Sequence, residues 1–381
     1  IIAINDKLKN RVQLGLAMQS LNNETLKDIK RKNWGRERYI EFIREIEKRG
    51  KSNTCEQIIP LPNETEETYY DGIKFLMDNN VKTQTYTLML IVGTELGRDE
   101  SARVNEIKAK FRILPKEFAK LQNGKKVMEI EEVVIGSNTL SFEDYLKIRL
   151  LAFSIFTTNQ PAFTPITKFL RQNKVDIFEL FNRPLDSEDL PESIAKLFNQ
   201  FKQATVDELW NSPEEIIENF QNENEYNKLL KDELGFNVLY FYQTLVNTKY
   251  MDDWTEYVIS LAKKLLLENN VDEKSKLEQY DNIANYCRGL TYNLMELNPT
   301  SNNPEFLLKY DVQNWVNDAS GITIEKFQFS EPRKIMFDYT LKDMKLFKDN
   351  IDIYGTSING MAQVLKRIPK FGLWRHSTII S

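Results

Sequence analysis

The chain has 381 residues, of which 41% are hydrophobic and 28% charged, the balance of an ordinary globular protein. Its net charge of -5, from 51 Lys and Arg against 56 Asp and Glu, argues against a protein that wraps nucleic acid. No run approaches the roughly 18 apolar residues of a membrane span, and the first residues lack the sections of a signal peptide. We therefore expect a cytoplasmic protein of more than one domain, with no membrane and no nucleic-acid partner.

Cysteine and histidine are too scarce for several kinds of site. Cys55 and Cys287 are the only cysteines, which excludes a disulfide framework and a cysteine-built zinc site. His376 is the single histidine, and a polar residue near the C-terminus is a simpler interpretation than a catalytic or metal-binding one. The glycine-rich loops that cradle phosphate groups are absent as well.

The first predicted strand covers residues 12–18, where VQLGLAM alternates large and small side chains as a strand buried on both faces does. A polar turn follows, in which Asn22 or Asn23 can cap a helix with Glu24 in its first turn. Arg31 is expected two to three turns into this helix.

The same pattern then repeats along the chain. A helix is predicted over residues 36–48, a strand over 54–62, a second helix after NETEET, and a strand over 84–96. Their buried stripes are Tyr39, Ile43 and Ile46 in the first helix, and Tyr69, Ile73 and Leu76 in the second. This order predicts parallel β-α units, whose strand ends open on one face, where such sheets place their ligands.

Different signals follow residue 98. Asn123-Gly124 between extended stretches predicts a hairpin. Ser141 and Asp144 are spaced as a capping box, and the helix after them is apolar nearly all round, so we expect it to be deeply buried. Helical periodicity continues to about residue 295, and a hairpin is expected around 322–340.

The ends of the predicted strands of the first part carry several polar side chains. Gln19 and Ser20 lie at the end of the first strand, Leu61 to Glu64 at the end of the second, and Gly93 and Thr94 at the end of the third. Arg31 could swing back over this mouth and pair with a carboxylate of a small ligand. In the alternative, Arg31 forms a solvated face with Lys30 and Lys32 and pairs with Glu24 or Asp28.

Three ordered stretches, MQSLNNETLKDIKRKN, EQIIPLPNETEETYYDGIKFL and YTLMLIVGTELG, carry a resemblance to a known family. They resemble the second half of the catalytic barrel in radical S-adenosylmethionine (radical SAM) enzymes, especially the subfamily with an N-terminal cobalamin-binding domain. Those enzymes commonly show Gln-Ser at a strand end, Glu-Thr-Leu-Lys-x-Ile-x-Arg in a helix, Gly-Leu-Pro-Gly-Glu-Thr, and later Pro-Gly-Thr-x-Leu. The resemblance covers about residues 11–97, with a softer similarity beyond.

The resemblance implies an α/β fold with a partial parallel (β/α) barrel half, of the TIM type, followed by a mainly α-helical C-terminal domain. The barrel half would cover residues 1–98, an extended or hairpin connection 99–140, and the helical domain 141–381. Because the chain starts at Ile1 inside such a barrel, we expect the C-terminal part of a longer protein, with the missing N-terminal barrel half in the same polypeptide.

The resemblance also implies cofactors and site residues. The family uses a [4Fe-4S] cluster to cleave S-adenosylmethionine reductively to a 5'-deoxyadenosyl radical that modifies a substrate, in some members with cobalamin. By this resemblance, Gln19, Ser20 and Arg31 would hold the amino-acid end and ribose of S-adenosylmethionine. The adenosine and substrate side would be lined by Gln57, Ile59, Leu61 and the backbone around Leu90, Ile91 and Val92.

The sequence departs from the family at three points. The cluster-binding Cys-x3-Cys-x2-Cys is absent, Pro60 and Asn63 stand where glycines are usual, and Val92 replaces proline. We expect the cluster ligands upstream and no activity from this chain alone. A natural cluster-free descendant, or a non-catalytic helical binding or scaffold protein that retains a barrel remnant, is the alternative. The substrate and the reaction type stay open.

Overall fold

A computed structural model of the chain describes residues 6–7, 17–49, 54–97, 105–186, 190–295, 303–368 and 373–380. The protein is of mixed α/β class and forms two compact units. The first unit comprises residues 1–152 and 205–235, and the second comprises 153–204 and 236–381. Two of the unit boundaries lie inside helices and the third lies in the loop after residue 230, whereas domain boundaries were predicted at residues 98 and 140.

The elements of the first unit are α2 (Asn23–Asp28), α3 (Arg36–Glu47), β1 (Thr54–Ile59), α4 (Glu66–Asp78), β2 (Lys82–Thr87), β3 (Lys108–Lys120), β4 (Lys126–Gly136), α10 (Pro213–Gln221) and α11 (Glu223–Leu230). Two helices cross the boundaries, namely α6 (Phe142–Thr158) and α9 (Glu192–Asp207).

The second unit contains η1 (Pro161–Phe163), α7 (Thr164–Gln172), α8 (Phe178–Asn182), η2 (Arg183–Leu185), α12 (Val238–Leu245), the π-helix η3 (Val246–Tyr250), α13 (Met251–Glu268), α14 (Lys274–Thr291), β5 (Glu305–Tyr310), α15 (Val312–Asn317), η4 (Ile324–Phe327), β6 (Gln328–Asp338), α16 (Leu341–Tyr354), α17 (Ile358–Arg367) and β7 (His376–Ile379).

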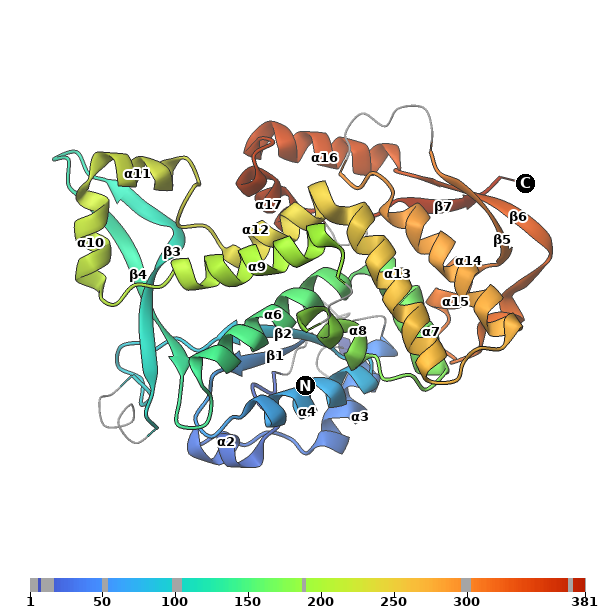
Figure 1. Ribbon diagram of the computed structural model, residues 1–381, viewed down its shortest axis with the longest axis horizontal. Helices are drawn as coiled ribbons and strands as arrows, with labels where there is room; N and C mark the ends of the chain where they lie inside the picture. The colour runs from blue at the N-terminus through green and yellow to red at the C-terminus, as the bar shows by residue number, and fades with distance from the viewer. Residues whose placement is uncertain are drawn as a thin grey trace. The chain divides into compact units, whose positions relative to one another are not determined.

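A small parallel sheet forms the start of the first unit (Figure 1). β1 pairs with β2 in parallel from Thr54↔Lys82 to Ile59↔Thr87. Gln19 adds a parallel bridge at the other edge of β1, where its N–H donates to the Glu56 carbonyl over 3.0 Å. The predicted parallel arrangement is therefore confirmed for the described residues; most of the first predicted strand, residues 12–16, lies outside them.

One face of this sheet is covered by α3 and α4. Alternate β1 residues are buried on that face, and the Tyr69 hydroxyl of α4 lies 2.5 Å from the Thr85 hydroxyl of β2. The predicted helix stripes are confirmed, since all six of their residues are buried. On the opposite face Glu56 is exposed and Tyr86 is 43% exposed, so that face is only partly covered.

The helix that was expected to carry Arg31 is shorter than predicted, and that prediction is wrong. α2 ends at Asp28, after Asn22 caps it as predicted. Lys30 takes the left-handed conformation with φ of 53°, and the N–H groups of Lys30 and Arg31 bond back to the carbonyls of Lys27 and Leu26. Those two bonds form a Schellman motif, so Arg31 begins the next loop.

The third predicted strand also ends early. β2 stops at Thr87, and the chain then pairs in antiparallel fashion with β4, through bonds of 2.9 Å between Leu88 and Val134 and between Leu90 and Glu132. Ile91 and Val92 are 58% and 98% exposed. The prediction of one strand to residue 96 is therefore wrong.

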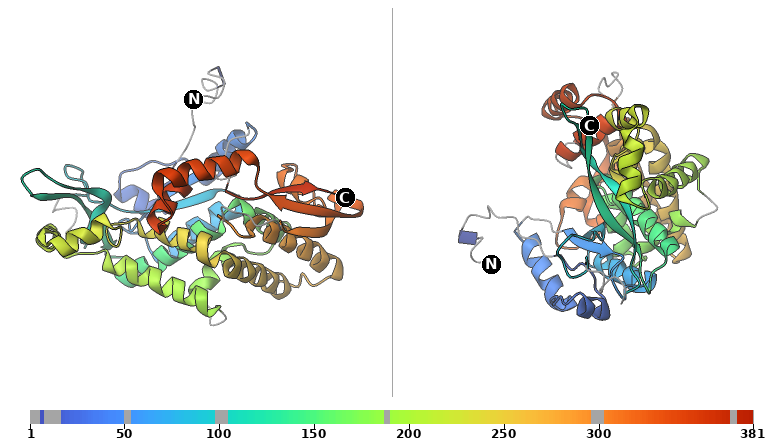
Figure 2. Two further views of the ribbon diagram at one scale, coloured as in Figure 1. Left: turned by 90° about the horizontal axis from the view of Figure 1, so that it is seen from above. Right: turned by 90° about the vertical axis from the view of Figure 1, so that its left-hand side faces the viewer.

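The hairpin at Asn123-Gly124 is confirmed. It joins β3 and β4, and Gly124 takes a φ of 83° in the turn. Both α10 and α11 pack against this hairpin, which the views in Figure 2 show beside them. The shared core contains Ile113, Ile216, Phe220, Tyr226 and Leu229, with Phe111, Phe118, Met128, Ile130 and Trp210 around it.

Two further local predictions are confirmed. The Ser141 and Asp144 side chains each accept a bond from the other residue's backbone N–H, at 3.1 and 3.0 Å, which is the capping box. The helix that follows is α6, and its predicted core residues Tyr145, Ile148, Leu151, Ala152 and Ile155 are all buried.

The second unit is helical with a small antiparallel sheet. The strand order is β5-β6-β7, drawn in orange to red in Figure 1. A hairpin within residues 322–340 was predicted, but β6 runs through that range as one strand. The predicted hairpin is therefore wrong, because the partners of β6 come from residues 305–310 and 376–379.

Candidate ligand site at the ends of the parallel strands

Five polar residues meet where the parallel strands end. Ser20 and Asn22 follow the bridge residue Gln19, Asn63 and Glu64 follow β1, and Thr68 lies in the first turn of α4. We call this set the strand-end network. Parallel packing brings these segments together, because the carboxyl ends of neighbouring parallel strands lie at one edge of the sheet.

The Glu64 carboxylate is the centre of the network. The Ser20 hydroxyl donates to its Oε2, and the Thr68 hydroxyl donates to its Oε1 over 2.6 Å. Asn22 joins the two sides, since its N–H donates to Ser20 Oγ and its side-chain amide to the Asn63 carbonyl, both over 3.0 Å. Ser20 and Glu64 are 3% and 2% exposed.

The electrostatics of Glu64 follow from this burial. Removal from water raises the pKa of the Glu64 carboxyl, and the hydrogen bonds from Ser20 and Thr68 oppose that rise. No Lys or Arg is paired with Glu64 within the described part of the chain. The network therefore contains a carboxyl group that is easier to protonate than an exposed glutamate.

The backbone at both strand ends is constrained. Gln19 and Asn63 have φ of 55° and 59° in the left-handed region, which costs a residue such as Gln19 about 1–2 kcal/mol and which asparagine adopts more readily. In addition, the Thr139 hydroxyl, from the loop before α6, donates to the Glu64 carbonyl over 2.7 Å. These contacts hold the two strand ends in one arrangement.

Arg31 lies beside the network, but its guanidinium group donates to Ala17 and Asn33. Its Nη2 donates to the Ala17 carbonyl and its Nε to Asn33 Oδ1, each over 3.0 Å. It is half-buried. Among the described residues, Arg31 forms no ion pair with Glu24 or Asp28. The alternative interpretation, in which Arg31 lies on a solvated face and pairs with one of these two residues, therefore named the wrong partners. Lys30 instead pairs with Glu95.

The remaining predicted site residues fall in three places. Gln57 and Ile59 are 2% and 0% exposed on the sheet face that carries α3 and α4, and Gln57 Nε2 lies near Gly72 of α4. Leu61 is 2% exposed and packs with Leu88 and Val134. Leu90, Ile91 and Val92 belong to the segment after β2. The structure therefore brings Gln19, Ser20 and Arg31 to one edge, and Leu61 lies buried beside Glu64 at the same strand end.

The residues present do not fit an iron-sulfur cluster. Cys55 and Cys287 are buried in different units, and burial raises the pKa of both thiols. Across the described ranges, His, Cys, Asp and Glu nowhere gather in a group of three that could hold a metal ion. His376 lies in β7 and contacts Asp343 Oδ2 at 2.9 Å.

Glu64 was predicted to lie at the end of the second strand, but it was given no binding role, although it is the centre of the network. It lies in the quoted PNET stretch, where an acidic residue before a helix is most simply explained by the helix dipole. Its burial depends on Ser20, 44 residues earlier. No local pattern reveals such a contact.

No model of a known protein family matches the sequence, and a search of curated proteins finds no match either. Within the part of the chain that the structure describes, no helix combines the length and the apolar character that crossing a membrane requires.

Proposed function

We propose that residues 17–97 belong to the second half of a radical SAM-type barrel, and that this chain works as part of a longer radical SAM enzyme. The proposal rests on the sequence resemblance. It is supported by one structural observation: three consecutive parallel segments, at Gln19, β1 and β2, lie in sequence order with α3 and α4 on one face. The opposite face would meet the rest of the barrel.

In this proposal the residues of this chain bind and orient S-adenosylmethionine. The cluster and S-adenosylmethionine would supply the radical, and the cluster ligands would come from outside this chain. Gln19 and Arg31, both half-buried, are the residues that would contact the amino-acid end of the cofactor. Ser20 would act indirectly, because its hydroxyl is already engaged with Glu64. Cobalamin remains a second candidate cofactor.

The proposal is tested with a polypeptide that includes the upstream coding sequence. If that sequence encodes a Cys-x3-Cys-x2-Cys motif, the protein is reconstituted anaerobically and S-adenosylmethionine binding is measured by calorimetry. Arg31→Ala should weaken binding at least tenfold, through loss of a charge-assisted contact. Lys32→Ala is the matched control, since Lys32 is a neighbouring exposed cation. Thermal melts check that both variants fold.

A second candidate function is a non-catalytic binding or scaffold protein. One observation favours it: the polar groups of Ser20, Glu64 and Thr68 satisfy one another in the buried network. This function predicts no upstream cysteine motif and no measurable affinity for S-adenosylmethionine. Either result, in a protein that folds, would overturn the enzyme proposal.

A further inference from the structure

A cavity of about 180 Å³ lies in the second unit, between the antiparallel sheet and helices α14 and α15. It is separate in sequence from the residues used above. Its lining is mostly aromatic and aliphatic, with a few polar groups. The lining residues used below are Tyr286, Leu308, Asp311, Gln313, Ser377 and Ile379.

The sheet register explains why a hollow forms there. Ile335 pairs with Ile379, and Phe337 pairs with Ser377, so these side chains share the face that carries Leu308. Phe337 is fully buried against Gly289 of α14, so its ring fills the space between the sheet and this helix. Leu308, Ile335 and Ile379 are smaller than a phenylalanine ring, and the cavity lies between them and Tyr286.

Three polar groups from three elements converge on this hollow. The Tyr286 hydroxyl of α14 donates to Gln313 Oε1 of α15 over 2.5 Å and lies 3.3 Å from Ser377 Oγ of β7. The Ser377 hydroxyl is 3.4 Å from the same Gln313 oxygen. Tyr286 is only 3% exposed, so its hydroxyl is fixed at the inner wall.

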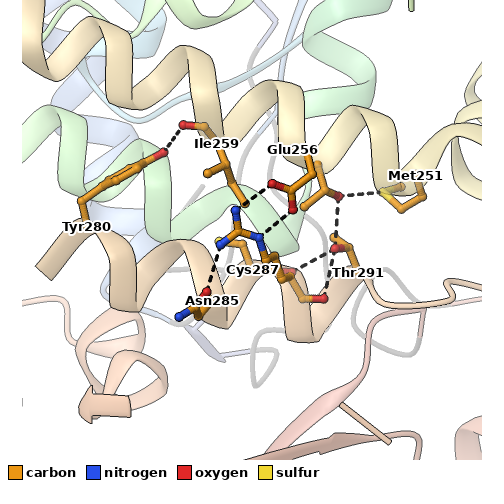
Figure 3. A network of polar contacts seen from close by, with 9 residues as sticks. Met251, Glu256, Ile259, Tyr280, Asn285, Cys287 and Thr291 are labelled. Atoms are coloured by element: carbon orange, nitrogen blue, oxygen red, sulfur yellow. Dashed lines mark hydrogen bonds and ion pairs between the residues drawn. The ribbon is translucent and has the colours of Figure 1, made fainter. Parts of the chain in front are cut away.

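Contacts with α13 hold α14 in place. The Tyr280 hydroxyl donates to the Ile259 carbonyl over 2.6 Å (Figure 3). The Thr255 hydroxyl donates to the Thr291 hydroxyl oxygen over 3.1 Å. The Arg288 guanidinium donates to both carboxylate oxygens of Glu256. Tyr286 therefore projects from a helix that is anchored along its length, as a preformed binding wall requires.

Size and charge restrict the ligand. An engineered apolar cavity of about 150 Å³ holds one benzene ring, so this cavity has room for one ring with a small substituent. Asp311 is the only charged side chain among the described lining residues, and its oxygens accept from Asn314 N and Nδ2 over 3.0 and 2.7 Å. An anionic ligand would therefore be disfavoured.

We infer that this cavity binds a single aromatic or heteroaromatic ring that carries a neutral or cationic hydrogen-bond donor. The ring lies against Leu308 and Ile379, and the donor reaches the oxygens of Tyr286 and Gln313. This binding goes beyond the proposed function and does not depend on it.

The test uses phenol, benzamidine and benzoate as probes, in NMR titrations of the whole chain. Phenol or benzamidine should shift resonances of residues 308–313 and 377–379 at millimolar concentration, and benzoate should bind at least tenfold more weakly. Tyr286→Phe should weaken phenol binding about tenfold, because one hydrogen bond is lost.

A variant that fills the cavity, together with a matched control, tests whether the probes bind there. Ile379→Trp should block binding, whereas Leu307→Trp should leave it unchanged, since Leu307 is 67% exposed on the other face of the sheet. The inference is overturned if none of the three probes shifts these resonances, or if folded Ile379→Trp binds phenol as the wild type does.

Discussion

The buried Glu64 carboxyl accepts hydrogen bonds from two hydroxyl groups. Within the described part of the chain, no Lys or Arg side chain pairs with it. Hydroxyl groups stabilise a carboxylate less than a positive charge does, so burial raises its pKa above the ordinary value. The folded state therefore binds the Glu64 proton more tightly than the unfolded chain does.

That difference predicts a pH-dependent stability. Between the ordinary glutamate pKa, about 4.3, and the raised pKa of the folded state, the native protein holds more protons. Its free energy of unfolding should therefore fall as pH rises through this window, and the contribution of Glu64 is largest below it. Glu64→Gln should lack this part of the pH dependence, as urea melts from pH 4 to 8 would measure.

The control for this experiment is Glu24→Gln, because Glu24 is exposed in the first turn of α2. It should leave the pH dependence of the wild type unchanged. If Glu64→Gln and wild type show parallel stability curves across the window, the pKa of Glu64 is not raised.

Gly289 and Gly72 give a second residue-level prediction. A Cβ at Gly289 would lie 2.4 Å from the Phe337 ring, which is fully buried, whereas a Cβ at Gly72 would lie 3.3 Å from Leu21 Cδ1. Gly289→Ala should therefore lower the free energy of unfolding by about 1–3 kcal/mol through overpacking. Gly72→Ala should be neutral or stabilise by up to about 1 kcal/mol through helix propensity.

Chemical denaturation of both glycine variants measures this difference. Adding Phe337→Leu to Gly289→Ala should recover part of the loss, because the smaller side chain frees space for the new methyl group. Equal stability of the two alanine variants would contradict the contact between Gly289 and Phe337.

At the scale of elements, sequence signals that act within one helix or one turn gave correct predictions. The turn at Asn123-Gly124, the Ser141 capping box and the apolar stripes of α3 and α4 are confirmed because each depends on residues within one element or turn. The end of α2 was missed because Lys30, not glycine, takes the left-handed position that closes the helix.

The segment after β2 was missed for a different reason. Its hydrophobic run predicted a strand, but Leu88 and Leu90 pair with β4, more than 40 residues later in the chain. That pairing turns the run away from the parallel sheet and leaves Ile91 and Val92 exposed. Contacts at such separation are invisible to periodicity.

A partly buried ion group joins three parts of the first unit. Arg112 of β3 contacts Glu131 of β4 at 2.5 Å and Glu208, which follows α9, at 2.8 Å, and all three side chains are less than 20% exposed. Arg112→Ala should lower the free energy of unfolding by about 1.5–3 kcal/mol, because two partly buried carboxylates lose hydrogen bonds from a charged partner. Thermal and urea melts would measure the loss.

The control is the exposed pair of Lys30 and Glu95, whose side chains are 71% and 62% exposed. Lys30→Ala should cost about 1 kcal/mol or less. A similar loss in both variants would mean that the Arg112 group is not sheltered from water.

At the scale of the whole molecule, the first unit is discontinuous in sequence. Residues 205–235 complete a core with β3 and β4, through Ile216, Phe220 and Tyr226. A chain cut at residue 152 should therefore expose that side of the hairpin and bind the dye ANS, with a lower melting temperature than a fusion that links 152 to 205 through a short Gly-Ser linker.

Equal stability of the cut chain and the fusion would contradict this account.

The candidate site also belongs to this scale, since its centre depends on residues from three loops. The sequence predicted that polar groups gather at the strand ends, but it could not predict that Ser20 and Glu64 satisfy each other.

The interrupted course of the first unit has a consequence for its synthesis. Ribosomes add roughly 5–20 residues per second, so the 83 residues between positions 152 and 235 take about 4 to 17 seconds to make. During that interval the apolar side of the β3–β4 hairpin stays uncovered, because α10 and α11 have not yet been made. A chaperone that binds nascent apolar strands would find its site there, and only before translation passes α11.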